Sequence, residues 1–196
     1  EISCSLVGSE MCIRDSPYMT WNWNGPSLET MSKSEKDALN ASWASLLDFC
    51  SDEDMLAVVD TSGSMHSSYG LPAAVALSLG LYLAEHNKGR FRNHFIEFSE
   101  RPQLIRLKGE TFVDKLRYIL TFDEIADTNL EAVFQLILCV AVKNKLPQKE
   151  LPGKLVIISD MEFNVCVTNA SETNFENARR RYEAYGYKPV SYTHLR

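Results

Sequence analysis

Hydrophobic residues recur along this chain in two rhythms, which predict strands alternating with helices. Short continuous apolar runs at 55–59 and 154–159 predict strands buried on both faces, as is typical of a parallel sheet. Residues 91–98 alternate in polarity and a second short run follows at 103–107, which together predict a hairpin. Apolar residues at helical spacing predict a helix over 34–49. We also expect apolar helices over 71–86 and 129–144, a short helix over 112–120 and a polar helix over 173–185.

Two apolar stretches predict which side chains are buried. In the first helix, one face carries residues spaced by three and four, with Ser32 or Ser34 available as the N-cap. That face comprises Leu39, Trp43, Leu46, Leu47 and Cys50. Cys139 lies in the run LILCVAV, and we expect it to be a small core residue.

Strands that alternate with helices predict an α/β domain with right-handed crossovers. The expected architecture is a three-layer, doubly wound, mostly parallel, Rossmann-like sheet with helices on both faces. Residues 186–190 resemble the approach to a further strand that is cut off, so we expect a fold truncated at its C-terminus. A short helical segment precedes it.

The two ends of the chain differ from the rest. LVGSEMCIRDS at 6–16 and VSYTHLR at 190–196 resemble adapter-derived peptides that recur at the ends of unrelated gene predictions. We therefore interpret residues 1–16 and 191–196 as non-native and leave them out of the fold prediction. The remaining chain divides into a loop and helix at 17–54 and a main, incomplete domain at 55–190.

Composition narrows the function classes. The chain has 196 residues, 45% of them hydrophobic, and a net charge of −6, as expected for one globular domain that as a whole repels nucleic acid. No apolar stretch is long and uninterrupted enough to span a bilayer, so we expect no membrane association. The five cysteines form no CxxC pair, which favours a reducing, cytoplasmic location.

The segment DTSGS at 60–64 carries the candidate chemistry. It follows a buried strand and offers the side-chain oxygens of Asp60, Ser62 and Ser64, although an ordinary turn or a helix cap would use the same residues. Thr128 precedes the helix at 129, and Asp160 ends the strand at 154–159. Because ligands bind at the carboxyl ends of parallel strands, all five side chains are expected at one sheet edge.

Hard oxygens in this number suit Mg²⁺, or Mn²⁺ in its place. Two carboxylates and three hydroxyls leave such a cation incompletely ligated and only partly neutralised. A carboxylate from a partner would complete the set.

The ordered set resembles a known family. D-x-S-x-S at 60–64, a threonine at 128 and an aspartate at 160 are similar to the metal-ion-dependent adhesion site, or MIDAS, of von Willebrand factor A (vWA) domains, over residues 55–190. The resemblance implies that Ser62, Ser64 and Thr128 ligate Mg²⁺ directly and that Asp60 and Asp160 act directly or through water. It also implies a protein partner that supplies an acidic residue.

Among vWA domains, VVDTSGSM, VIISDMEF and GYKP are most similar to intracellular members. These include the A domain of Ro-type RNA-binding ribonucleoproteins and an uncharacterised family in plants, fungi, bacteria and viruses. The alternative reading is therefore a part of a Ro-like ribonucleoprotein, which would bind RNA through an upstream helical region missing here. The oligomeric state is left open.

Enzymatic alternatives fit less well. Mg²⁺-dependent phosphohydrolases of the haloacid dehalogenase type need a second aspartate two residues after the first, where this chain has Ser62, and a hydroxyl cannot replace that acid. The GxSxG elbow of serine hydrolases is absent. We therefore predict a non-enzymatic interaction module.

Overall fold

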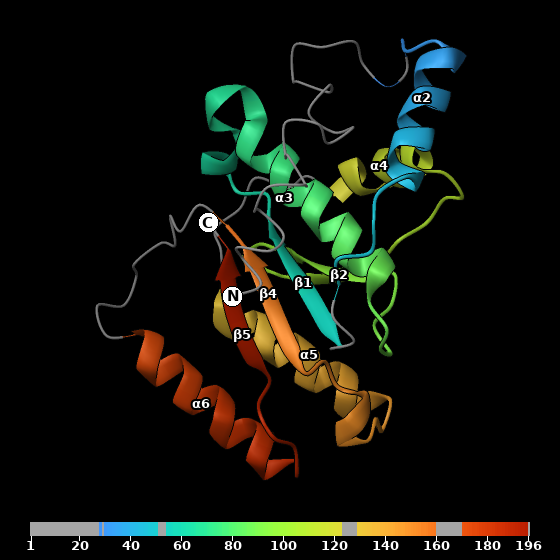
Figure 1. Ribbon diagram of the computed structural model, residues 1–196. Coiled ribbons are helices and arrows are strands. Elements are labelled where there is room, and N and C mark those ends of the chain that lie inside the picture. Colours follow the sequence, from blue (N-terminus) through green and yellow to red (C-terminus); the bar gives the residue numbers. More distant parts are fainter. Residues whose placement is uncertain (1–27, 29, 51–53, 123–128, 160–169, 196) are drawn as a thin grey trace.

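The structure is a computed structural model of the chain (Figure 1). It describes residues 28, 30–50, 54–122, 129–159 and 170–195, and within them the side chains of 66–71, 170–175 and 192–195 are outside the description. Thr128 and Asp160, two of the five expected site residues, lie outside the described residues.

A five-stranded sheet forms the centre of the fold, in the order β3-β2-β1-β4-β5. The strands are β1 (Met55–Asp60), β2 (His94–Phe98), β3 (Gln103–Arg106), β4 (Lys154–Ile158) and β5 (Ser191–Leu195). All neighbours are parallel except β2 and β3, which form the expected antiparallel hairpin. The prediction of an α/β fold with a mostly parallel sheet is confirmed.

Helices cover both faces of the sheet (Figure 1). They are α2 (Lys33–Ala44), α3 (Ser67–His86), α4 (Phe112–Ile119), α5 (Leu130–Lys143) and α6 (Ala170–Ala184), with short 3-10 turns η3 (Gly63–His66), η4 (Leu120–Phe122) and η5 (Gln148–Glu150). Successive residues of β1 point to opposite faces. Ala57 and Val59 therefore pack with α2, α3 and α4, whereas Leu56 and Val58 pack with α5 and α6.

The contact between α3 and β1 depends on a glycine. A Cβ atom at Gly80 would lie 2.3 Å from Cγ2 of Val59, so any larger residue there would push the helix away from the strand. This close approach seats the helix that follows the DTSGS segment directly on the central strand.

Helix α2 ends earlier than predicted. It begins with the expected N-cap Ser32, but stops at Ala44, and only Leu39 and Trp43 of the predicted face are buried on it. The following backbone bonds to the hydroxyl of Tyr82 on α3, which donates to the carbonyl of Leu47 and accepts from the N–H of Phe49, each at 2.6 Å. Tyr82 replaces the helical partners of these backbone groups. Leu47 is consequently 64% exposed instead of buried.

The prediction for Cys139 was wrong, because this side chain is exposed. Helix α5 is apolar nearly all round, so periodicity alone does not indicate which face meets the sheet. The structure buries the face that carries Val133, Phe134, Ile137, Leu138 and Ala141.

A further strand is present where the sequence suggested a cut-off one. β5 begins at Ser191 and pairs in parallel with β4 from Lys154 to Ile158. It therefore consists of residues that we had left out of the fold prediction. Their non-native origin stays a prediction, as do the domain divisions.

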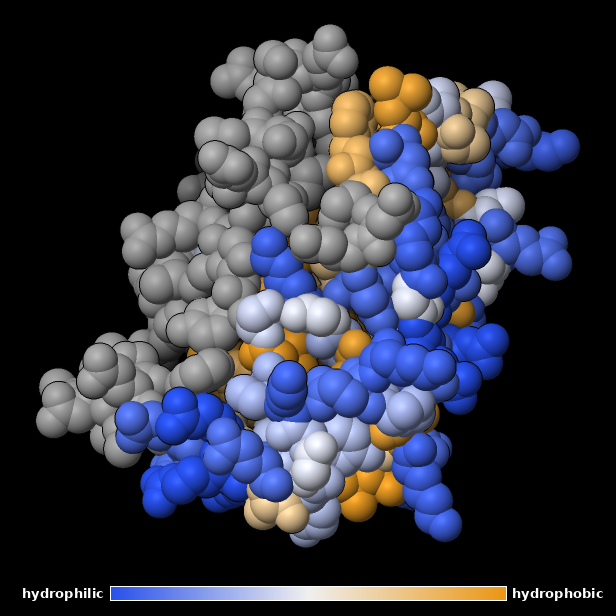
Figure 2. Space-filling view, turned by 60° about the horizontal axis from the view of Figure 1, so that its bottom comes forward, coloured by the Kyte–Doolittle hydropathy of each residue, from blue (hydrophilic) through white to orange (hydrophobic). Residues whose placement is uncertain are grey.

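One face of the molecule is shown in a space-filling view. The face in Figure 2 is mostly hydrophilic, with hydrophobic atoms in small separate areas. Within the described ranges, no helix has the length and apolar character needed to cross a membrane.

Candidate functional site

The carboxyl ends of three parallel strands meet at one edge of the sheet. Asp60, the last residue of β1, is opposite Phe98 of β2, and Val59 is opposite Ile158 of β4. The three strands therefore end at the same level, and the described residues directly after them, Thr61, Ser99 and Ser159, are all polar.

Asp60 is buried and held from two sides. This residue is only 1% exposed. Oδ2 accepts a hydrogen bond from Oγ of Ser159 at 2.5 Å, and Oδ1 accepts one from the backbone N–H of Ser62 at 2.8 Å. Because Ser159 follows β4 and Ser62 follows β1, the carboxylate joins the two strand exits and is fixed in orientation.

The two serines of the motif lie side by side. Oγ of Ser62 is 3.1 Å from Oγ of Ser64, and both residues are partly exposed. The N–H of Met65 donates to the carbonyl of Ser62 at 3.0 Å, which closes the turn that brings the hydroxyls together.

This separation can be compared with the geometry of a cation site. Adjacent oxygens in an octahedral Mg²⁺ shell, at about 2.0–2.1 Å from the ion, are about 2.9 Å apart. The Ser62 and Ser64 hydroxyls therefore fit two neighbouring ligands of one Mg²⁺ ion. Uncharged hydroxyls and a carboxylate are also hard oxygen donors of the type that Mg²⁺ and Mn²⁺ take.

The described neighbours of the other two expected ligands lie at the same edge. The N–H of Asn129, which follows Thr128 in the sequence, donates to the carbonyl of Ser99 at 3.3 Å, just beyond β2. Ser159, which precedes Asp160, is the residue that bonds to Asp60. In the part of the chain that the structure describes, Asp60, Ser62 and Ser64 are brought together as expected.

A second carboxylate at this edge was missed by the sequence analysis. Glu97, on β2, is 2% exposed. Its Oε1 accepts from Oγ1 of Thr61 at 3.4 Å, and its Oε2 accepts from Oγ of Ser99 at 3.0 Å. Thr61 and Ser99 are themselves buried. The available signal was the position of Glu97 in the alternating strand, on the same face as the core residue Phe95.

Among the described residues, no group of three or more His, Cys, Asp or Glu side chains could hold a metal ion. The donors that the structure brings together are one carboxylate and two hydroxyls, so a cation here would depend on hydroxyl ligands.

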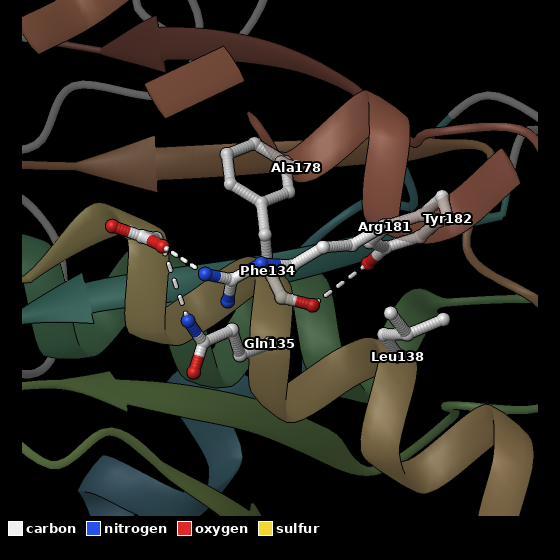
Figure 3. Close-up of a pocket in the computed structure, with 7 residues that line it drawn as sticks. Phe134, Gln135, Leu138, Ala178, Arg181 and Tyr182 are labelled. Carbon is white, nitrogen blue, oxygen red and sulfur yellow. Dashed lines mark hydrogen bonds and ion pairs between the residues drawn. The ribbon is translucent and has the colours of Figure 1, made fainter. Parts of the chain in front are cut away.

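Two other recesses in the described part of the chain are less suited to binding a ligand. The pocket between α5 and α6 has a volume of about 10 Å³, close to the minimum for a single water molecule. Figure 3 shows that it lies beside two links between the helices: Arg181 pairs with Glu131 at 3.0 Å, and the Tyr182 hydroxyl donates to the Phe134 carbonyl at 2.9 Å. It is a packing defect at a helix contact.

A larger, polar groove of about 460 Å³ lies beyond the C-terminal end of α3. Two of its cations are already paired: Lys88 with Asp48 at 2.6 Å, and Lys115 with Glu85 at 2.5 Å. The first ion pair connects the segment after α3 to the segment after α2, and the second connects α3 to α4, which gives the groove a structural explanation.

The fold and the polar edge together define a class: an α/β domain with a candidate binding site at the carboxyl ends of its parallel strands. The chain belongs to the family named domain of unknown function DUF7788, whose model matches residues 54–192. It is also similar to an uncharacterized protein of Acanthamoeba polyphaga mimivirus, with 34% identity over 162 residues. This match covers 80% of the chain but 28% of the viral protein, so the chain spans less than a third of that relative.

Proposed function

We propose that this chain is a vWA-type interaction module that binds Mg²⁺ or Mn²⁺ and, through the cation, an acidic residue of a partner protein. The observation that carries the proposal is the 3.1 Å separation of the Ser62 and Ser64 hydroxyls beside the buried carboxylate of Asp60. This arrangement suits two adjacent ligands of an octahedral cation.

In this proposal Ser62 and Ser64 ligate the cation directly. Asp60 compensates its charge, directly or through water, in the orientation that Ser159 holds. Thr128 and Asp160, outside the described residues, complete the protein's ligands. The bound cation supplies a positive charge with a coordination position open to a partner carboxylate, and no covalent chemistry is involved. The non-enzymatic role and the cytoplasmic location stay predictions.

The first test is a calorimetric titration of Mg²⁺ and Mn²⁺ into the whole chain. We expect saturable binding by the wild type and at least a tenfold loss in Ser62→Ala, because one direct ligand is removed. Ser45→Ala is the matched control, since its exposed hydroxyl caps the end of α2 and should leave cation affinity unchanged. Circular dichroism confirms that each protein is folded.

A folded wild type that binds neither cation would refute the proposal. So would a Ser62→Ala variant that binds as tightly as the Ser45→Ala control.

The second test addresses the partner. A capped Gly-Glu-Gly peptide should change the NMR spectrum of the Mg²⁺-loaded protein, and the Gly-Gln-Gly peptide should not, because only the first carries a carboxylate. Binding of the glutamate peptide that survives removal of Mg²⁺ with EDTA would contradict recognition through the cation.

A further inference from the structure

We propose that the domain carries a second interaction surface, which binds an acidic segment of a protein partner. The surface is formed by the end of α5 with the turn that follows it, and by the segment after α6. We call it the lysine surface, and it comprises Val142, Lys143, Lys145, Lys149, Tyr185 and Lys188. It goes beyond the proposed function, because it needs no cation and none of the motif residues.

The lysine surface lies at the opposite end of the sheet from Asp60. The turn after α5 leads into β4, and the segment after α6 leads into β5. Since β4 and β5 run parallel to β1, both segments lie where these strands begin, whereas Asp60 lies where β1 ends. Figure 1 shows this end at the bottom of the view, and Figure 2 brings it forward. An acidic segment bound here would leave the DTSGS segment open to a second ligand.

Hydrogen bonds hold the two segments of the lysine surface together. The N–H of Lys188 donates to Oε1 of Gln148 at 2.7 Å. The hydroxyl of Tyr187 donates to the carbonyl of Leu146 at 2.8 Å. These bonds join residues 40 and 41 positions apart in the sequence, so lysines from both segments belong to one surface.

The positive charge of the lysine surface is not neutralised by the described residues. Within that part of the chain, none of its four ammonium groups takes part in an ion pair or a hydrogen bond. The sequences KNKLPQK and YGYKPV of the two segments contain no acidic residue. Glu150, which follows the first, pairs with Arg90 at 3.8 Å. Glu183, just before the second, pairs with Arg179 at 3.7 Å.

Lys145 occupies a position where glycine would fit better. It follows Asn144, the C-cap of α5, and its φ of 50° lies in the left-handed region. The N–H of Leu146 donates to the carbonyl of Ala141 at 2.9 Å, which is the hydrogen bond of a helix end that usually carries glycine. A residue with a Cβ is strained in this conformation, whereas glycine adopts it freely. Replacing Lys145 by glycine therefore removes a charge without harming the fold.

Two exposed apolar side chains indicate what kind of acidic ligand fits. Val142 is 38% exposed and Tyr185 is 62% exposed, and each belongs to one of the two segments. Apolar side chains within a polar rim are typical of contact surfaces between proteins, where tyrosine is enriched. A partner segment with leucine among its acidic residues would bury the leucine here while its carboxylates face the lysines.

A nucleic acid fits this surface less well. The whole chain has a net charge of −6, so a polyanion longer than the lysine surface would be repelled by the rest of the molecule. Proteins that bind single strands also offer several aromatic side chains on which successive bases stack, and the lysine surface offers one, Tyr185.

The experiment measures the binding of two capped, fluorescently labelled peptides to the whole chain by fluorescence anisotropy. One peptide has three Glu-Glu-Leu repeats, and the other has three Gln-Gln-Leu repeats. EDTA is present, so that no cation at the DTSGS segment contributes. We expect the glutamate peptide to bind about tenfold more tightly than the glutamine peptide, and to bind more weakly as salt is added, because salt screens surface charges.

Two double variants test where the peptide binds. Lys149→Gln with Lys188→Gln removes one lysine from each segment, and should weaken binding of the glutamate peptide about tenfold. The matched control is Lys33→Gln with Lys36→Gln, which removes two lysines from α2, on the other face of the sheet. Its affinity should stay within about twofold of the wild-type value, because charges at that distance are screened.

Lys145→Gly separates the role of the charge from the fold. We expect binding of the glutamate peptide to weaken about threefold. The urea midpoint of unfolding should not fall below that of the wild type, because glycine relieves the left-handed strain. Should the double variant of the lysine surface fail to fold, Lys145→Gly decides: an unchanged affinity, or a loss accompanied by a lower midpoint, would overturn the inference.

The remaining outcomes are equally decisive. A wild type that binds neither peptide, or both equally, would overturn the inference. The same holds if the double variant of the lysine surface binds as tightly as the α2 control. A single-stranded oligothymidylate of twelve nucleotides that binds more tightly than the glutamate peptide would assign the surface to nucleic acid instead. None of these outcomes bears on the proposed function, because EDTA is present throughout.

Discussion

The hydrogen bond between Ser159 and Asp60 gives a sharp test of the site's architecture without any cation. Both residues are buried, at 3% and 1% exposure, and the hydroxyl lies 2.5 Å from the carboxylate. The bond joins residues 99 positions apart, across the exits of β4 and β1. Ser159→Ala removes one oxygen atom and leaves Oδ2 of Asp60 without this donor.

The size of the stability loss expected for Ser159→Ala follows from the charge of the carboxylate that accepts the bond. A hydrogen bond to a charged group contributes about 1.5–3 kcal/mol to stability, and a buried acceptor left unpaired loses that contribution in full. We therefore expect Ser159→Ala to lower the free energy of unfolding by about 1.5–3 kcal/mol.

Ser78→Ala is the matched control. Ser78 is also buried, at 8% exposure, but its hydroxyl donates to the backbone carbonyl of Ala74 within α3. That neutral carbonyl is also positioned to accept the usual helical bond, and alanine is the better helix former by roughly 0.5 kcal/mol. The free energy of unfolding of Ser78→Ala should therefore lie within about 0.5 kcal/mol of the wild-type value.

The assay is urea-induced unfolding followed by circular dichroism, in EDTA so that no cation contributes. The slope of the free energy of unfolding against urea concentration should be the same for the three proteins, since the surface exposed on unfolding hardly changes. If Ser159→Ala costs no more than Ser78→Ala, Asp60 is not held by this bond, and the description of the site is wrong.

Two further predictions concern residues that precede β1. Trp43→Ala should lower the free energy of unfolding by about 3–5 kcal/mol, because Trp43 is 8% exposed and stacks on Phe112 with ring centroids 4.3 Å apart. A loss below about 1 kcal/mol in urea unfolding would mean that α2 is not packed against the rest of the domain. Burial raises the pKa of Asp54, whose Oδ1 is buried without a hydrogen-bond partner among the described residues. The contribution of Asp54 to stability is therefore fully present below its unfolded pKa and is lost as the pH rises through its folded pKa. Urea unfolding at a series of pH values from 3 to 7, about the unfolded pKa upward, should thus show Asp54→Asn gaining on the wild type with rising pH, and a pH-independent difference would contradict this.

Local sequence patterns predicted most of the secondary structure. The short apolar runs became β1 and β4, the alternating segment became β2 with β3 as its hairpin partner, and α4 and α5 lie within one residue of their predicted bounds. These elements were predictable because burial on one or both faces leaves a periodic record in the chain itself. The same is true of the motif, since Asp60, Ser62 and Ser64 are neighbours in sequence and one turn suffices to bring them together.

Contacts between distant segments were decided only by the tertiary structure. The hydroxyl of Tyr82, 35 residues from Leu47, donates to the carbonyl of Leu47, a residue that the pattern had assigned to the first helix. The choice of the buried face of α5 depends on where the sheet lies, which is why Cys139 was placed wrongly. The alternation in β2 places Glu97 on the same face as Phe95, but only the tertiary structure shows that it meets Thr61, 36 positions away in the sequence.

The sequence by itself therefore determined the order of strands and helices and the motif that follows β1, because periodicity and turn chemistry act over a few residues. The tertiary structure decided which side chains hold that motif in place. Ser159 and Glu97 reach it because parallel strands from distant parts of the chain end at one edge of the sheet. Such proximity is set by strand order and register, which local patterns do not specify.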